Sequence, residues 1–291
     1  MSNPLESLLS VLNLEKLADS HFRGLSGTSL WRRVFGGHVM AQALEAAQRT
    51  VEFDRHVHSF HGYFLQPGNP DFFIDYDVEL LRDGRSFSVR HVKAMQQNKL
   101  IFSLSASFQI EETGYAYQRP MDNNIQTPEE ILAKAGAEEK ILAHAPGFVN
   151  SYANQHRAFI ILPLDVDNYI HRTDRKPRQK TWFKLNGTIK NDRRLRSVIL
   201  AYMSDMTLLD TALYPHGLSI ISPSIMPASL DHAMWFHRQP DFDDWLLYDC
   251  CSPNSSGARG LSRGFIYNRS GELVATTCQE GLLRSVKSKS Q

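Results

Sequence analysis

The chain has 291 residues, enough for two domains or for one large domain with a sizeable core. Hydrophobic residues make up 42% and charged residues 22%, and the formal net charge is +1. This balance is ordinary for a globular protein and gives no electrostatic case for a nucleic acid or an anionic membrane as a partner. No apolar run reaches the roughly 18 residues that span a bilayer, and the opening segment has no basic signal-peptide region.

The three cysteines, Cys250, Cys251 and Cys278, are odd in number and include an adjacent pair. Their spacing fits neither a disulfide framework nor a zinc site. We therefore expect a cytoplasmic protein in a reducing compartment.

In chain order, the first strong pattern is "GGHVMAQALEAAQ" at 36–48, which predicts a helix. The segments "FSVRHVKAM" and "KLIFSLSASFQI" then alternate apolar and polar residues, which is typical of half-exposed antiparallel strands. "QQNK" between them predicts a hairpin turn. A polar stretch at 119–150, with Pro and Gly near its ends and a helical centre, is interpreted as a linker.

The second half repeats this order of features. The run 194–213 predicts a helix that is apolar nearly all round, so a sheet should enclose it. At an offset of 173 residues, Gly84 aligns with Gly257, and strand-like runs follow in both places, the later pair joined by the turn "NRSGE". We predict an N-terminal domain at 1–118, the linker at 119–150 and a C-terminal domain at 151–291, each a helix followed by antiparallel strands.

A helix wrapped by a curved antiparallel sheet, occurring twice, is the α+β double-hotdog arrangement. Motifs of known proteins with this arrangement occur along almost the whole chain: "VFGGHVMAQAL" (34–44), "VHSFHGYFLQPG" (57–68), "LRDGRSFSVR" (81–90), "AYMSD" (201–205), "ALYPHG" (212–217), "SLDHAMWFHR" (229–238), "SGARG" (256–260) and "TTCQEGLLR" (276–284). In these motifs the chain resembles acyl-CoA thioesterases of the thioesterase II family, whose members are double hotdogs. The resemblance implies hydrolysis of fatty acyl-CoA to a fatty acid and CoA, no cofactor beyond the CoA of the substrate, and self-association to a dimer or tetramer.

Thioester hydrolysis needs a water aimed at the carbonyl carbon, a base for its proton and donors for the oxyanion. The family uses an Asp, a Ser or Thr hydroxyl and a Gln, and its motifs place these on Asp205, Ser229 and Gln279. Aligning the two helices puts Gly36 opposite Asp205, and the 173-residue offset puts Ala106 opposite Gln279. The first half thus lacks both polar groups, and the second half is predicted to be catalytic.

Apolar residues lie three or four positions before and after Asp205, a spacing that predicts Asp205 on one face of a continuous helix. There it would be an ionised but poorly hydrated carboxylate, suited to act as a base. Alternatively, Asp205 caps a helix segment after a break at Ser204. Asp210 is a rival base, but it matches no motif, and a solvated or locally paired carboxylate is the preferred interpretation.

Five further residues are candidates for substrate binding. His58 lies in a family motif, Gly37 precedes a helix whose backbone N–H groups can face a phosphate or carbonyl, and three arginines lie near turns that CoA phosphates can reach. The three arginines are Arg85, Arg259 and Arg263.

Two motif matches are set aside. "GLSRG" at 260–264 satisfies the nucleophile-elbow pattern, but the residues after Ser262 predict a hairpin and not the helix that the elbow needs. His56, His58 and His61 invite a metal site, but simple strand alternation puts His61 on the opposite side from the other two, and we expect no metal.

Two other functions stay open from the residues alone. An acyl-CoA hydratase of the same fold usually pairs its carboxylate with a His a few residues away; five residues after Asp205 stands Asp210 and not His, which argues against a hydratase. A non-catalytic acyl-CoA binding or sensing protein would not need three polar groups kept in one half.

Overall fold

The computed structural model describes residues 3–27, 33–134 and 158–286. The chain forms two compact units. Unit 1 comprises Met1–Gln118, Ile189–Met206 and Asp231–Pro240, and unit 2 comprises Arg119–Thr188, Thr207–Leu230 and Asp241–Gln291. Both units are therefore assembled from segments that lie far apart in the sequence.

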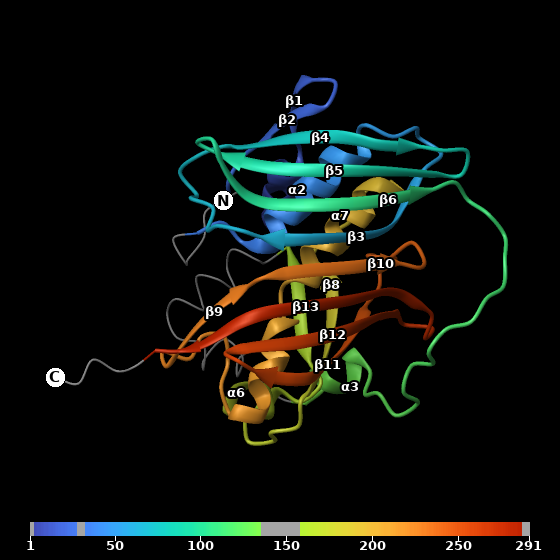
Figure 1. Ribbon diagram of the computed structural model, residues 1–291. Helices are drawn as coiled ribbons and strands as arrows, with labels where there is room; N and C mark the ends of the chain where they lie inside the picture. The colour runs from blue at the N-terminus through green and yellow to red at the C-terminus, as the bar shows by residue number, and fades with distance from the viewer. Residues whose placement is uncertain (1–2, 28–32, 135–157, 287–291) are drawn as a thin grey trace. The chain divides into compact units, whose positions relative to one another are not determined.

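Unit 1 is an antiparallel sheet with the strand order β1-β2-β4-β5-β6-β3-β10 (Figure 1). Short turns join β4 to β5 and β5 to β6, and β10 returns from a distant part of the chain to pair with β3. The strands are β1 (Glu15–Ala18), β2 (His21–Gly24), β3 (His56–Phe64), β4 (Ile74–Asp83), β5 (Phe87–Gln96), β6 (Lys99–Gln109) and β10 (Asp231–Phe236).

Two helices pack against each other in unit 1, α2 (Gly36–Gln48) and α7 (Arg193–Ser204), while α1 (Pro4–Leu12) packs on α2. The middle of α2 carries small buried residues, among them Ala41, Ala43 and Ala46, which allow a close approach to β4, β5 and β6. At its start, a Cβ on Gly37 would lie 2.7 Å from the carbonyl oxygen of Tyr202 in α7. The helices meet there so closely that only glycine fits.

Unit 2 is built on antiparallel pairs in the order β9-β13-β12-β11-β8-β7, and the 3₁₀ segment η1 (Leu209–His216) packs on β8, β11, β12 and β13. A second layer of apolar side chains gathers around Trp182, Trp245 and Ile131. The other elements are α3 (Pro128–Leu132), α6 (Val166–His171), β7 (Phe159–Pro163), β8 (Arg178–Leu185), β9 (Ile225–Ser229), β11 (Leu246–Ser256), β12 (Arg259–Asn268) and β13 (Leu273–Ser285).

The predicted helix at 36–48 and both predicted hairpins are confirmed. Residues Gln97 and Asn98 join β5 to β6 with positive φ angles, and Gly271, at φ 86°, lies in the turn between β12 and β13. The runs β4-β5-β6 and β11-β12-β13 repeat the same meander, in agreement with the double-hotdog prediction. The predicted division at 118 and 150 stays a prediction; residues 135–150 of the predicted linker lie outside the described residues.

Two local predictions are wrong. The predicted helix at 194–213 is not continuous, because α7 ends at Ser204 and a turn separates it from η1. The Ser204 hydroxyl donates to the carbonyl of Ala201 and the Met206 amide to that of Met203, so the helical ladder closes there. His61 was expected on the opposite side from His58, but a bulge near residue 58 restores both to the outward side of β3.

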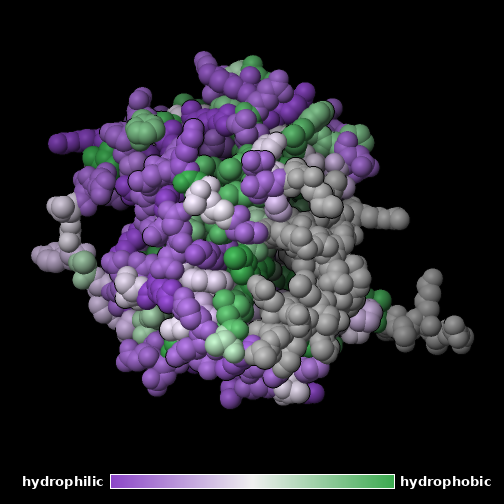
Figure 2. Space-filling model, turned by 180° about the vertical axis from the view of Figure 1, so that it is seen from behind, coloured by the Kyte–Doolittle hydropathy of each residue, from purple (hydrophilic) through white to green (hydrophobic). Residues whose placement is uncertain are grey.

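Polar side chains dominate the face of the molecule drawn in Figure 2, between small groups of hydrophobic ones. Within the described part of the chain, no helix is long and apolar enough to cross a membrane.

Candidate active site

Asp205 is the residue at the C-terminal end of α7, with φ −87° and ψ −4°. Its side chain is only 4% exposed. A Cβ on Gly36, the first residue of α2, would lie 2.8 Å from Oδ2 of Asp205, so the carboxylate occupies the space that a side chain at position 36 would need. Asp205 thus lies at a helix end and not on the face of a continuous helix. The break that the alternative expected is present, but Asp205 ends α7 and does not cap the next segment, whose N-cap is Leu208.

The two helix ends act on this carboxylate in opposite senses. A helix C-terminus carries unpaired carbonyl groups and disfavours an anion, whereas a helix N-terminus presents free N–H groups and favours one. Asp205 ends α7 and contacts the start of α2. The positive charge of Arg33 interacts with the Asp205 carboxylate, although burial lowers the pKa of this guanidinium. The site therefore holds a carboxylate where α7 alone would disfavour it.

His232 is a neighbour of Asp205 that the sequence analysis missed. It lies on β10, its side chain is 0% exposed, and its Nδ1 is 3.9 Å from Oδ1 of Asp205. Burial lowers the pKa of His232 to about 3, so the imidazole is neutral at ordinary pH. A His therefore lies beside the carboxylate although none stands within a few residues of Asp205 in the sequence, so the presence of Asp210 five residues on no longer argues against a hydratase.

Ser229 and Gln279 form a hydrogen-bonded pair in unit 2. Ser229 ends β9, Gln279 is fully buried on β13, and Nε2 of Gln279 donates to Oγ of Ser229 over 3.0 Å. Because Oγ accepts this bond, the Ser229 hydroxyl proton is available for another acceptor. The pairing is the arrangement expected if the amide fixes the hydroxyl, and it joins residues 50 apart in the chain.

Ser262 is a strand residue of β12, as predicted, and not part of a nucleophile elbow. It is fully buried directly opposite Gln279 in the β12–β13 register. Two small polar side chains and an amide thus line one part of unit 2.

Asp210 is buried in η1 and forms an ion pair with Arg172, while its other oxygen accepts from the backbone N–H of Ile220. Burial raises the pKa of Asp210, and the Arg172 guanidinium opposes that rise. The carboxylate is paired, but its partner is 38 residues away and not local. Both of its oxygens are engaged, which makes Asp210 a poor acceptor for a proton from water.

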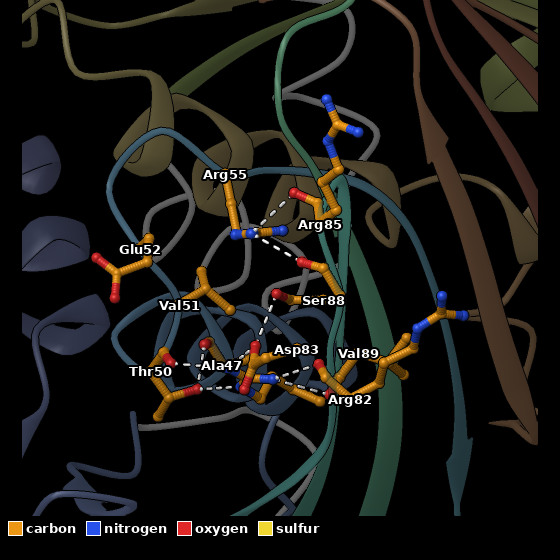
Figure 3. A network of polar contacts seen from close by, with 12 residues as sticks. Ala47, Thr50, Val51, Glu52, Arg55, Arg82, Asp83, Arg85, Ser88 and Val89 are labelled. Atoms are coloured by element: carbon orange, nitrogen blue, oxygen red, sulfur yellow. Dashed lines mark hydrogen bonds and ion pairs between the residues drawn. The ribbon is translucent and has the colours of Figure 1, made fainter.

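Arg85 lies in the turn between β4 and β5 (Figure 3). Its carbonyl accepts a hydrogen bond from Arg55, while its exposed side chain points away from the network. The buried guanidinium beside it belongs to Arg90, which binds Asp83 and the Thr50 backbone and side chain. This network fixes the turn and presents Arg85 to solvent.

The other predicted binding residues fall in several places. Arg259 is exposed and pairs with Glu280, and Arg263 is exposed with its guanidinium 5.7 Å from the ring of Phe265. His58 is half-buried on the outward side of β3 and contacts the Ser107 hydroxyl at 2.8 Å. Burial lowers the pKa of His58.

Gly37 lies at the start of α2, next to Gly36 and the carboxylate. Of these candidates, it is the one that the structure brings to Asp205 within unit 1. In residues 3–27, 33–134 and 158–286, no group of three or more His, Cys, Asp or Glu side chains has the geometry of a metal site.

Comparison with known proteins gives matches over nearly the whole chain. A family profile described as acyl-CoA thioesterase matches residues 157–282, and one described as acyl-CoA thioesterase N-terminal domain matches 27–109. The chain is 40% identical to acyl-CoA thioesterase 2 of Haemophilus influenzae, over 98% of this chain and 99% of that protein.

Solved structures agree with these matches. The structure of acyl-CoA thioesterase II TesB2 from Mycobacterium marinum is 35% identical, with a TM-score of 0.78 over 96% of this chain and 99% of that one. A hotdog-fold protein of unknown function from Alicyclobacillus acidocaldarius has a TM-score of 0.76 at 15% identity, over 98% of this chain and 100% of that one. The second likeness concerns the fold alone.

Proposed function

Because the chain belongs to the acyl-CoA thioesterase family and is a hydrolase of acyl-CoA thioesters, we propose that Asp205 is its general base and that Ser229 and Gln279 position the attacking water. The single observation that carries the proposal is the placement of the Asp205 carboxylate, 4% exposed, against the glycine start of α2.

The reaction has two bond changes at the thioester carbon. The water oxygen bonds to that carbon as one water proton passes to Asp205, and the carbonyl oxygen takes the negative charge. The carbonyl then re-forms, the C–S bond breaks, and the CoA thiolate takes the proton from Asp205. The products are a carboxylic acid and CoA, and no covalent enzyme intermediate is needed.

The N-terminus of α2 supplies backbone N–H donors that can stabilise the oxyanion. Gly36 and Gly37 carry backbone N–H groups of the first turn, which have no acceptor within their own helix. Such donors, fixed before the reaction, stabilise charge that develops on a substrate oxygen. In this proposal Gly37 contributes through its backbone, and His58, Arg85, Arg259 and Arg263 stay proposed contacts of CoA or of the acyl chain.

The finer assignments are also part of the proposal. The substrate is a fatty acyl-CoA of lipid metabolism, and the enzyme works in the cytoplasm as a homo-oligomer, a dimer or a tetramer. Three free cysteines, Cys250, Cys251 and Cys278, support a reducing compartment. No cofactor, nucleic acid or membrane is invoked.

The test is a double-mutant cycle with Asp205→Asn and Gln279→Ala, measured as thiol release from acyl-CoA. Residues that act on one water are strongly non-additive, so the double variant should be little slower than Asp205→Asn alone. Fully additive losses would separate Gln279 from the reaction of Asp205. Consumption of a 2-enoyl-CoA without thiol release would instead indicate the hydratase.

A further inference from the structure

The chemistry proposed above leaves His232 without a role, although it is the buried titratable group next to the base. Its imidazole is fully buried, and the ring of Phe60 stacks against it with centroids 6.1 Å apart. Burying a polar ring costs free energy of folding unless its polar atoms are hydrogen-bonded, and buried polar groups normally are. One of its two nitrogens is not.

The hydrogen bonds of Ser204 determine which nitrogen of His232 carries the proton. The Ser204 hydroxyl donates to the carbonyl of Ala201 at 2.7 Å, so it has only lone pairs to offer His232. With the hydroxyl proton assigned to the Ala201 carbonyl, Nε2 of His232, 3.0 Å from this oxygen, is the protonated nitrogen that donates to it. Nδ1 consequently carries a lone pair.

That lone pair faces the carboxylate. Nδ1 is buried with no hydrogen-bond partner in the described part of the chain, and it is 3.9 Å from Oδ1 of Asp205. While Asp205 is ionised, two acceptors face each other. Once the carboxyl is protonated, a movement of about 1 Å gives an ordinary O–H···N hydrogen bond, and such contacts commonly tighten during the reaction.

We propose that His232 is a positioning residue for Asp205, whose Nδ1 accepts the hydrogen bond of the carboxyl group after that group has taken a proton from the attacking water. The proposal rests on the assignment of Asp205 as the base. The proton stays on the Asp205 oxygen until the CoA thiolate removes it. His232 thereby makes the protonated carboxyl more favourable, and Asp205 a stronger base, without itself becoming charged.

Other titratable or charged groups of unit 1 also interact with this carboxylate. Arg33 precedes α2 and favours the anion, and Tyr202 of α7 has a pKa raised by burial and by the charge of Asp205. The start of α2 contributes the N–H groups of its first turn next to Gly36, while the ring of Phe60 on β3 packs against His232. Arg33 and the start of α2 favour the charged form, whereas the C-terminal end of α7 and the acceptor Nδ1 of His232 favour the neutral one.

Two substitutions separate the nitrogens. His232→Gln can keep a donor near Nε2 for Ser204 but removes the acceptor at Nδ1, whereas His232→Asn puts a carbonyl oxygen near Nδ1. We expect kcat of the Gln variant to fall roughly ten- to hundredfold, the effect of one hydrogen bond to an ionisable group. Its acid limb in the pH–activity profile should move to lower pH, while KM changes little. The Asn variant should keep the wild-type limb.

Thermal melting of both variants checks that they fold. Should His232→Gln not fold, Ser204→Ala is the second variant. It removes the acceptor of the Nε2–H group, so that the His232 proton can move to Nδ1 and face the carboxylate, and it should move the acid limb in the same direction. An unmoved limb in the folded Gln variant, or equal shifts in Gln and Asn, would overturn the proposal. Full activity of Asp205→Asn in the same assay would instead refute the proposed function itself.

Discussion

The two glycines that open α2 have different neighbours, and we predict different consequences of adding one methyl group to each. In Gly36→Ala the new Cβ would lie 2.8 Å from Oδ2 of Asp205 and 3.0 Å from the ring of Phe64. Ordinary contacts of this kind begin near 3.4 Å, so the carboxylate must move by about 0.5 Å or rotate. In Gly37→Ala the new Cβ would meet the backbone carbonyl of Tyr202 at 2.7 Å.

In Gly36→Ala, moving the Asp205 carboxylate should lower kcat more than it lowers the free energy of unfolding. A shift of this size can lower kcat by roughly ten- to hundredfold. Alanine is a better helix former than glycine by up to about 1 kcal/mol, so the free energy of unfolding of Gly36→Ala should change by less than about 1 kcal/mol. Gly37→Ala strains α2 against the backbone of α7 and should lose about 1 to 3 kcal/mol of stability.

The assay is steady-state thiol release together with urea unfolding of each variant. Gly114→Ala is the matched control, because nothing lies within 4 Å of its added Cβ; it should leave both readouts unchanged. If Gly36→Ala is as active as Gly114→Ala, the reaction does not depend on the position of the Asp205 carboxylate next to Gly36, which would refute this prediction.

Three further predictions concern buried charged or titratable groups. Burial lowers the pKa of His38 from 6.5 to about 4. Below pH 6.5 the unfolded chain therefore binds more protons than the folded one, and the free energy of unfolding decreases as the pH is lowered towards 4. His38→Gln should recover about 2 kcal/mol in urea unfolding at pH 5 but not at pH 7. Arg90→Met should lose about 3 kcal/mol in urea unfolding because it removes the hydrogen bonds of a buried guanidinium to the Arg82 and Thr50 carbonyls, against less than about 0.5 kcal/mol for the exposed Arg85→Met. Equal losses would contradict the network. Asp210→Asn should lose about 3 kcal/mol by breaking the buried pair with Arg172, while its folded fraction keeps thiol release within about threefold; a hundredfold loss would make Asp210 the base.

Local patterns predicted the parts of the fold that local chemistry decides. The helix at 36–48 and the turns at 97–98 and 269–272 follow from composition and spacing within short windows. The helix break after Ser204 was predicted only as an alternative. The apolar pattern of the sequence continues across it into η1, and the hydrogen bond from the Ser204 hydroxyl to Ala201 does not change that pattern. One extra residue in β3 likewise reversed the predicted side of His61.

The candidate site was predictable only where a family motif marked it. The motifs singled out Asp205, Ser229 and Gln279, whose catalytic roles stay proposals, and the hydrogen bond between the last two came from the structure. His232 stands in the same motif as Ser229, but its contact with Ser204 spans 28 residues and depends on how β10 pairs with β3. Such contacts are set by tertiary packing, which no sequence window reports.

The most direct test of the central claim is thiol release from acyl-CoA substrates of increasing chain length by the wild type and by Asp205→Asn. The control is Asp19→Asn, a fully exposed carboxylate of unit 1, and thermal melting verifies all three proteins. We predict that the wild type and the control hydrolyse the substrates and that folded Asp205→Asn loses at least roughly a hundredfold. A folded Asp205→Asn that retains wild-type activity would show that Asp205 is not the base.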